Sequence, residues 1–377
     1  MQAGGNLLLH ISGKEKALEN KKTNFYSIIH SICKEQGIAC RDYADGWAFE
    51  LYRECGEGAE ISSISGSECN RKGSPANKKS SFIFGYQFGL NLSAVQQICN
   101  DKGAASEVME AKGIPHVHHQ AFMCPPMQKF VGGDGCFQEI LDVFEAQGRN
   151  LVVKDNEGTG GHLVFHVTRR KELELAAFEI FSSCNSIALC PYYDILQEYR
   201  VVLLDGEVKV IFSKIRQGIT GDGASTLLEL YQAYLAEEGA KEDGAAKRAT
   251  VEQAAAESGF LQQDLTRISE NGQFYPFQWK HNLGQGAGAL LIDPEDVPEA
   301  VALAKKAAEA LQVRFGSFDV VRTAEGMQIL EVNTGVMMEN LAGMSEENYR
   351  LVKSVYTEAI EKSLYLFSTL TDTSKNP

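Results

Sequence analysis

The chain has 377 residues and a mass of 41.4 kDa, a length that predicts two or three domains. Hydrophobic residues make up 44% and charged residues 23%, which is ordinary globular usage and excludes wholesale disorder or a fibrous repeat. The formal net charge of -14 at pH 7 repels phosphate backbones and anionic lipids. We therefore expect neither nucleic acid nor a membrane as a partner.

Apolar runs and cysteine usage indicate the compartment. No apolar stretch approaches the ~20 residues that span a bilayer, and the short run at residues 7–9 lacks the flanks of a signal peptide. The nine cysteines are an odd number without a CxxC pair, which argues against both a disulfide framework and a zinc knuckle. We expect a cytoplasmic protein with reduced thiols.

The first third of the chain predicts short elements around a polar insert. A helix is expected over residues 23–36, with Gly37 as its stop. Residues 56–81 are rich in Gly, Ser, Glu and Lys, which is typical of a surface loop. The elements expected next are a strand and two helices, at residues 82–86, 93–99 and 102–112. Gly113 and Pro115 end the last of these helices.

The middle of the chain predicts antiparallel strand pairs. A β-branched strand over residues 150–154 ends in Lys154 and continues through a glycine-rich turn into a second strand, residues 163–167. The elements expected after it are a helix, a strand and a hairpin, at residues 172–181, 187–189 and 198–213. Strand pairs mixed with helices predict the α+β class.

Helices dominate the expectation for the rest of the chain. Residues 221–226 cap a helix that runs through Tyr234, and residues 235–259 are helical but weakly amphipathic, as in an insert. Residues 282–289 form a second glycine-rich loop, and an alanine-rich helix covers residues 298–311. A hairpin and a final helix close the chain.

The late hairpin, residues 315–334, carries the strongest chemical signal. If Glu325 is the centre of its turn, Asp319 lies directly opposite Glu331. Opposed side chains in an antiparallel pair have Cβ atoms about 5 Å apart, and the period of two places Asn333 on the face of Glu331. Three oxygen ligands therefore converge.

Facing carboxylates within an apolar hairpin repel each other unless one is protonated or a cation lies between them. Mg²⁺ prefers oxygen ligands and usually keeps a place for phosphate oxygens. The hairpin of Asp319 and Glu331 therefore predicts a metal that carries a nucleotide. The alternative is that both carboxylates flank solvent on an edge hairpin.

The glycine-rich turn after Lys154 supplies a second candidate site. Backbone N–H groups without an obstructing Cβ can fold over phosphates beside the charge of the lysine. The turn matches neither GxGxxG nor GxxxxGKT, so an ordinary hairpin tip is the alternative. Lys102 is weaker as a candidate, because most lysines next to an aspartate at a helix start are solvated.

Two other groups have ordinary interpretations. His116, His118 and His119 suggest a metal, but His119 faces away from the other two and no carboxylate lies close in the sequence. Cys184 and Cys190 are interpreted as packing residues, because no neighbouring histidine or helix start marks an activated thiolate.

Several motifs in one order resemble the ATP-grasp ligases, in particular the ribosomal-protein glutamate ligases, glutathione synthetases and cyanophycin synthetases. The motifs cover residues 91–365. They are Asn100-Asp101-Lys102 with Gly113-Ile114-Pro115, Leu151-Val152-Val153-Lys154 with Glu157-Gly158-Thr159-Gly160-Gly161, Glu198-Tyr199-Arg200-Val201-Val202 with Asp205-Gly206-Glu207-Val208, Gly221-Asp222-Gly223 with Thr226 to Leu230, Lys280-His281-Asn282-Leu283, and Asp319 with Glu331-Val332-Asn333.

The resemblance implies roles for individual positions. Lys102, Lys154 and the loop of Glu157, Gly158, Thr159, Gly160 and Gly161 would bind ATP phosphates, with Leu189, Cys190, Tyr192 and Tyr193 in an adenine pocket within residues 187–193. Asp319, Glu331 and Asn333 would bind two Mg²⁺, for which Mn²⁺ can substitute. Arg200, Lys214, Lys280 and Asn282 would act on the transferred phosphoryl group. Lys280 replaces the arginine usual in the family, so a bidentate phosphate contact is lost there.

The implied fold is an ATP-grasp fold of two α/β subdomains behind an N-terminal α/β domain. The expected domains are residues 1–95, 96–194 and 195–370. The implied activity is ATP-dependent activation of a small carboxylate as an acyl phosphate, followed by transfer to an amine or to a carrier-protein thiol. A small-molecule kinase and a nucleotide-binding regulator without turnover are the alternatives. Substrates, oligomeric state and the roles of residues 56–81 and 235–259 are left open.

Overall fold

The computed structural model describes residues 24–53, 79–131, 137–240, 244–257, 260–279 and 288–372. The chain divides into two compact units, one formed by Met1–Leu92 with Thr334–Pro377 and the other by Ser93–Asn333. The three expected domains, which have different boundaries, stay a prediction. Among the residues that the structure describes, no helix has the length and apolar character needed to cross a membrane.

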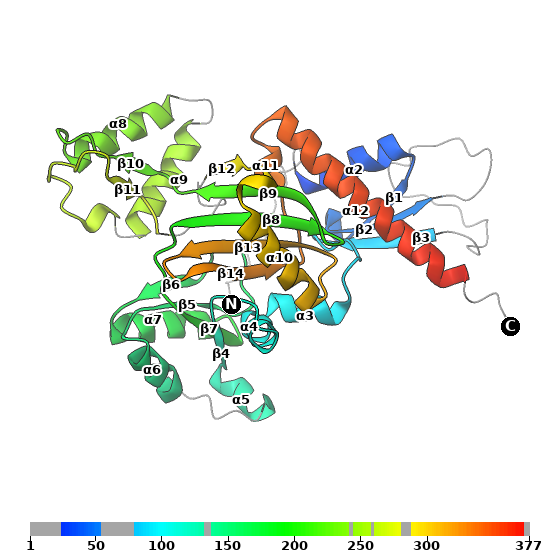
Figure 1. The fold of residues 1–377 in the computed structure, drawn as a ribbon, viewed down its shortest axis with the longest axis horizontal. Coiled ribbons are helices and arrows are strands. Elements are labelled where there is room, and N and C mark those ends of the chain that lie inside the picture. Colours follow the sequence, from blue (N-terminus) through cyan, green and yellow to red (C-terminus); the bar gives the residue numbers. More distant parts are fainter. Residues whose placement is uncertain are drawn as a thin grey trace, which may run out of the picture. The chain divides into compact units, whose positions relative to one another are not determined.

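The α+β class expected from the sequence is confirmed. The described residues combine helices with four sheets, and every strand pair within these sheets is antiparallel. Figure 1 shows the strands and helices in sequence colours.

The first unit is built around a three-stranded sheet and two long helices. Its main elements are α2 (Phe25–Gln36), β1 (Ala39–Tyr43), β2 (Ala48–Arg53), β3 (Lys79–Phe84), α11 (Glu339–Ala342) and α12 (Glu346–Asp372). Helix α2 begins where the Asn24 side chain accepts a hydrogen bond from Ser27 N, and it ends at Gly37, whose φ of 62° is left-handed. The expected helix over residues 23–36 is therefore confirmed.

The second unit contains a four-stranded sheet with strand order β4-β7-β5-β6. The strands are β4 (Gln120–Met123), β7 (Ser186–Pro191), β5 (Leu151–Asp155) and β6 (Val164–Val167). The helices that connect them are α5 (Pro125–Val131), α6 (Phe137–Ala146) and α7 (Arg170–Phe181). Buried residues of α6 and α7, including Phe144 and Leu173, pack against Val153 and Leu189 of the sheet. Burial of this apolar layer fixes the strand that carries Lys154.

The second unit also contains a five-stranded sheet with strand order β12-β9-β8-β13-β14. Its strands are β12 (Gly288–Leu291), β9 (Glu207–Ile215), β8 (Gln197–Leu204), β13 (Phe315–Thr323) and β14 (Gly326–Asn333). Three helices, α3 (Ser93–Asn100), α4 (Lys102–Ala111) and α10 (Pro298–Leu311), pack on one face through a shared apolar core that includes Ala304 and Phe318. Figure 1 shows α10 lying across these strands. The opposite face is therefore left for polar side chains.

A smaller group of elements has its own core. It consists of β10 (Gly218–Thr220), β11 (Phe274–Pro276), α8 (Leu227–Gly239) and α9 (Gly244–Glu257). The rings of Tyr231, Phe260 and Phe277 meet at centroid distances of 5.1 to 5.3 Å. The expected cap of α8 is confirmed, because the Thr226 hydroxyl accepts from Glu229 N and the Glu229 carboxylate accepts from Thr226 N.

The late hairpin contains the predicted carboxylate pair, although its turn differs from the expected one. Thr323 pairs with Gly326 and Val320 with Ile329, a register that would place Asp319 opposite Leu330 if it continued unbroken. A β-bulge next to Val320 adds one residue on β14, so that Asp319 lies opposite Glu331. The pairing is confirmed, and the bulge rather than the turn produces it.

Candidate functional site

One cavity of about 190 Å³ in the second unit is lined by residues of both larger sheets. It brings together most of the residues predicted from the sequence: Lys102, Lys154, Gly158, Thr159, Gly160, Gly161, Cys190, Tyr192, Tyr193, Arg200, Lys214, Asp319 and Glu331. Five basic and four acidic side chains line it, a surplus of one positive charge in a chain whose formal charge is -14. A concave site of this kind favours an anionic ligand.

Lys102 enters the cavity from the first turn of α4. Asp101 caps this helix by accepting a hydrogen bond from Ala104 N at 2.9 Å. The Lys102 side chain is buried, its Nζ donates to the Gly158 carbonyl oxygen at 2.6 Å, and it lies 3.5 Å from Glu331 Oε1. Burial lowers the pKa of this amine, and Glu331 partly offsets the effect. The alternative of a solvated lysine is wrong.

The glycine-rich turn is tied to α4 and needs its glycines. The fully buried Asn156 accepts a hydrogen bond from Gly103 N through Oδ1 at 3.1 Å. A Cβ on Gly158 would lie 2.8 Å from Asp155 Cβ, and Gly160 has a φ of 69°. Only glycine adopts this path without strain, because other residues meet either a steric clash or an unfavourable φ. The turn therefore brings its backbone to the cavity beside Lys102.

Lys154 is the second cation on this side of the cavity. It lies on β5 with 8% of its surface exposed. It makes no hydrogen bond or ion pair with any residue that the structure describes, although it lies close enough to Lys102 to lower the pKa of that amine. A buried, unpaired ammonium group is unfavourable unless an anion joins it. This position is therefore suited to a phosphate.

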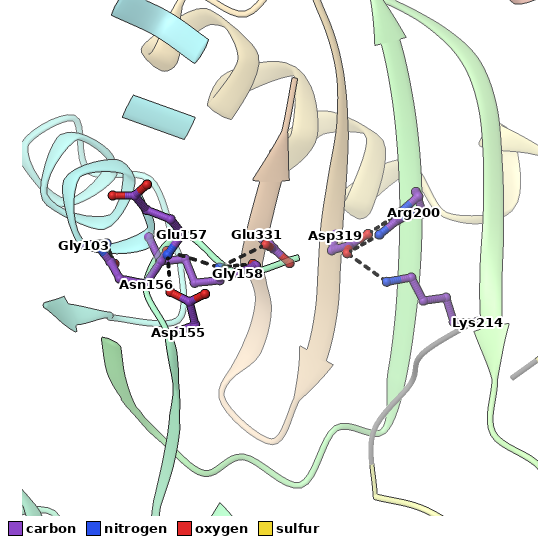
Figure 2. A network of polar contacts seen from close by, with 10 residues as sticks. Gly103, Asp155, Asn156, Glu157, Gly158, Arg200, Lys214, Asp319 and Glu331 are labelled. Atoms are coloured by element: carbon purple, nitrogen blue, oxygen red, sulfur yellow. Dashed lines mark hydrogen bonds and ion pairs between the residues drawn. The ribbon is translucent and has the colours of Figure 1, made fainter. Parts of the chain in front are cut away.

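The five-stranded sheet contributes a network of buried charges. Asp319 on β13 accepts two hydrogen bonds from Arg200 of β8, from Nε and Nη2, each at 2.7 Å. It also accepts one from Lys214 Nζ of β9 at 2.8 Å, and Lys214 donates in addition to Glu198. Figure 2 shows Asp319 between these cations and Glu331, which faces the glycine-rich turn. The network places both Arg200 and Lys214 at the cavity wall.

Burial and charge act in opposite directions on the two acids of the network. Burial raises the pKa of Asp319, but Arg200 and Lys214 outweigh it and hold the pKa below its ordinary value. Burial also raises the pKa of Glu198, and here the attraction of Lys214 does not compensate for it. Asp319 is therefore ionised at neutral pH.

The facing carboxylates of Asp319 and Glu331 already have cationic side chains beside them, and a metal bound there stays a prediction. Arg200 and Lys214 neutralise Asp319, and Lys102 lies beside Glu331. The carboxylates nevertheless fit a hard cation, because they lie directly opposite each other on β13 and β14, both line the cavity and both offer oxygen donors. Glu331 has 26% of its side chain exposed and one ion pair at 3.5 Å, which leaves oxygen lone pairs that can bind a metal ion.

Aromatic and apolar side chains form the remaining wall. Cys190, Tyr192 and Tyr193 line it, and the Tyr192 ring stacks on His166 with centroids 3.9 Å apart and planes at 17°. Leu189 does not line the cavity: it points to the opposite face of the four-stranded sheet, into the core with Phe144. The alternation of side chains along β7 explains the difference.

The structure separates other predicted residues from the cavity. Glu157 is exposed and does not line it, and neither does Asn333, although Asn333 follows Glu331 on β14 with an unbroken register. Lys280 and Asn282 lie outside the described residues, as does most of the second glycine-rich loop.

Several cavity residues were not predicted as site residues, among them Glu198, Arg216 and Trp279. Glu198 stands two positions before Arg200, so the period of a strand could have placed both on one face. Arg216 and Trp279 follow β9 and precede the undescribed loop, and no local pattern connects them. Their positions depend on tertiary structure.

The interpretation of the histidines and cysteines needs one correction. A carboxylate does lie close to the histidine group, because Glu110 Oε2 is 3.0 Å from His118 Nδ1. The two residues are eight positions apart, and the end of α4 brings them together. Burial raises the pKa of the Cys184 and Cys190 thiols, which agrees with their interpretation as packing residues.

Comparisons with known proteins give sequence and fold similarities. No protein-family profile matches the chain. It is 22% identical to the cyanophycin synthetases of Trichormus variabilis and of a Nostoc species over 307 residues, which cover 77% of this chain and 32% of those proteins. The resemblance that the motifs indicate is thus confirmed by sequence similarity to one of the named groups of ATP-grasp ligases. The chain spans about a third of the length of these relatives.

Similar solved structures include two ligases. The D-alanine–D-alanine ligase from Bacillus anthracis is 16% identical, with a TM-score of 0.45 over 72% of this chain and 69% of that one. A bifunctional glutathione synthetase from Pasteurella multocida is 13% identical, with a TM-score of 0.47 over 88% of this chain and 43% of that one.

Proposed function

We propose that the chain is an ATP-dependent ligase of the ATP-grasp type, which joins a small carboxylate to an amine. The cavity carries this proposal. Two buried lysines and a glycine-rich turn approach it from α4 and the four-stranded sheet, and the carboxylates of Asp319 and Glu331 approach it from the five-stranded sheet. Cations and backbone N–H groups opposite hard oxygen donors are the arrangement that a triphosphate with a metal requires.

The proposed reaction has two steps. A carboxylate oxygen of the substrate attacks the γ-phosphorus, the bond to the β–γ bridging oxygen breaks, and ADP leaves with both electrons of that bond. The amine then attacks the acyl carbon and inorganic phosphate leaves. Phosphoryl transfer depends mainly on positioning and charge neutralisation. The cavity supplies such groups and no serine or cysteine nucleophile beside a base among its described residues.

Each residue type has a proposed role in these steps. Lys102 and Lys154 bind phosphate oxygens, and the turn at Gly158 covers them. Arg200 and Lys214 stabilise negative charge on the transferred phosphoryl group. Asp319 and Glu331, with Asn333, would hold Mg²⁺, two ions for which Mn²⁺ can substitute, and the bound metal would neutralise the phosphate oxygens. The roles of Lys280 and Asn282 stay predictions.

The proposed adenine position is the wall formed by Cys190, Tyr192 and Tyr193. An apolar wall with a stacked aromatic pair suits a flat heterocycle. Trp279 lies within 6.0 Å of the Tyr192 ring, measured between centroids, and extends this aromatic surface. The domain division at residues 95 and 194 is part of the same proposal, because it would place the adenine wall at the junction of two subdomains.

The test is a turnover assay with product analysis. The purified chain is incubated with ATP, Mg²⁺ and pools of amino acids and small acids, and mass spectrometry identifies the nucleotide and the ligated product. We expect ADP, phosphate and a C–N product. Hydroxylamine should intercept the intermediate as a hydroxamate. Release of AMP would contradict the acyl-phosphate route.

The same assay separates the alternatives. A phosphorylated product without hydroxamate indicates a small-molecule kinase. Nucleotide binding without consumption of ATP in any pool indicates a regulatory module. A product formed only when a carrier-protein thiol is added would identify a thiol rather than an amine as the acceptor.

A further inference from the structure

Three potential metal ligands, His30, Cys40 and Asp42, meet between α2 and β1 in the first unit, and Cys33 lies beside Cys40. His30 and Cys33 are three positions apart on α2, so they lie on one face of the helix. Cys40 and Asp42 are two positions apart on β1, so they lie on one face of the strand. The left-handed Gly37 turns the chain from the helix into the strand, and the two pairs then face each other.

The distances between these side chains suit a single ion. His30 Nε2 lies 3.0 Å and Cys40 Sγ lies 3.7 Å from Asp42 Oδ1. The ligand atoms of these three residues all lie within 4.8 Å of one another, and the buried Cys33 side chain interacts with the Cys40 thiol. Two ligands about 2.0–2.3 Å from one tetrahedral Zn²⁺ are about 3.3–3.8 Å apart. Small movements of these side chains therefore complete the geometry.

Neighbouring groups orient two of the ligands. The Tyr26 hydroxyl donates to Asp42 Oδ2 at 2.8 Å, which leaves Oδ1 directed at His30 and Cys40. The His30 ring lies against Tyr26 and Phe49, at centroid distances of 4.3 and 5.9 Å. Hydrogen bonds to ligating carboxylates and packing of imidazole rings are the usual supports of protein metal sites.

We propose that His30, Cys33, Cys40 and Asp42 bind one Zn²⁺ ion. Two thiolates and an imidazole are soft and borderline ligands, which select zinc over Mg²⁺ or Ca²⁺. Cys33 is 3% exposed, whereas the His30 and Asp42 side chains are 35% and 32% exposed, so an ion reaches the site from solvent. The site is independent of the proposed ligase activity.

Zinc binds thiolates, so its binding would displace the thiol protons of Cys33 and Cys40 into solvent.

A second group of possible ligands, Glu110, His116 and His118, is less suitable. His116 uses both ring nitrogens already, one 2.8 Å from the Ile114 carbonyl oxygen and the other 2.9 Å from Ser106 Oγ. The group contains no thiol. It serves as the competing location in the experiment.

The experiment measures metal binding by the full-length, reduced protein. Zn²⁺ is titrated against a chromophoric chelator, and Co²⁺ replaces it for visible spectroscopy. We expect one high-affinity equivalent, a thiolate-to-cobalt absorption band and the intense bands of tetrahedral Co²⁺. Cys40→Ala should lower affinity at least about 100-fold, more than the loss of an outer-shell partner. Cys99→Ala, which removes a buried thiol from the second unit, is the matched control and should bind normally.

Asp42→Asn is the second variant, because its isosteric amide keeps the fold if Cys40→Ala does not. It should weaken zinc binding while the melting temperature without metal stays near that of the wild type. Added zinc should raise the melting temperature of the wild type and of Cys99→Ala but not of Cys40→Ala. Absence of bound zinc, equal binding by Cys40→Ala and Cys99→Ala, or binding that depends on His118 would each overturn the proposal.

Discussion

Replacing Asp319 by asparagine removes the central charge of the buried network while nearly preserving its shape. Arg200 and Lys214 then lose the carboxylate that accepts three of their hydrogen bonds. Breaking a buried ion pair costs about 3–5 kcal/mol. Because Glu198 remains beside Lys214 and the Arg200 side chain is 20% exposed, we expect a loss near the lower end, about 3 kcal/mol.

Glu331→Gln is the matched variant on the facing strand. Its carboxylate has one ion pair, 3.5 Å from Lys102 Nζ, and its side chain is 26% exposed. Loss of such a pair costs below about 1 kcal/mol. If both carboxylates hold metal, however, the two variants should abolish substrate-dependent release of ADP alike.

Thermal unfolding and ADP release separate the two effects. At about 2–4 °C per kcal/mol for a unit of this size, Asp319→Asn should lower the melting temperature by about 6–12 °C and Glu331→Gln by less than about 4 °C. Equal losses of stability in the two variants would refute the distinction between Asp319, which belongs to a buried ion network, and Glu331, which is a partly exposed carboxylate. Normal turnover of folded Glu331→Gln would refute the metal assignment.

Three further changes test the phosphate side and one helix cap. Lys154→Met should weaken ATP binding at least about tenfold without loss of stability, because the amine has no ion-pair partner among the described residues; calorimetric titration measures this, and unchanged affinity contradicts it. In Gly158→Ala the added Cβ would lie 2.8 Å from Asp155 Cβ. This variant should raise KM for ATP while its melting temperature stays near that of the wild type. Hydrogen bonds from Thr168 and Arg169 lower the pKa of Glu172 from 4.5 to about 2, so this carboxylate stabilises the fold above pH 4.5 and its contribution is lost as the pH falls toward 2. Glu172→Gln should remove about 1 kcal/mol of that acid-dependent stability after solvent screening. An unchanged curve of melting temperature against pH would contradict a stabilising role for the hydrogen bonds that Glu172 accepts from Thr168 N and Arg169 N at the start of α7.

The proposed zinc site shows the limit of predicting metal ligands from residue spacing in the sequence. The absence of a CxxC pair in the sequence argues against a zinc knuckle. The described ligands instead combine a helical i,i+3 pair with a strand i,i+2 pair across the turn at Gly37. Neither spacing is a signal alone, because most such pairs are never brought to face one another.

Local interactions were sufficient to predict the helices and strands whose start and stop signals lie within or next to them in the sequence. The caps at Asn24 and Thr226 and the stop at Gly37 involve residues within a few positions, so the energy that selects them is visible in the sequence. The strand that carries Lys154 is predictable for a similar reason, since β-branched residues followed by glycines favour a strand and a turn.

The environment of each charge was decided only by tertiary structure. Asp319 meets Glu331 through a bulge rather than a simple turn, and it is neutralised by Arg200 and Lys214 because the order of the five-stranded sheet places β8 beside β13 and β9 beside β8. Residues more than 100 positions apart form these pairs. Sequence determines which residues can carry charge, cap a helix or bind an ion. Strand order and burial determine which charges meet, because electrostatic energy depends on separation in space and on exclusion of water.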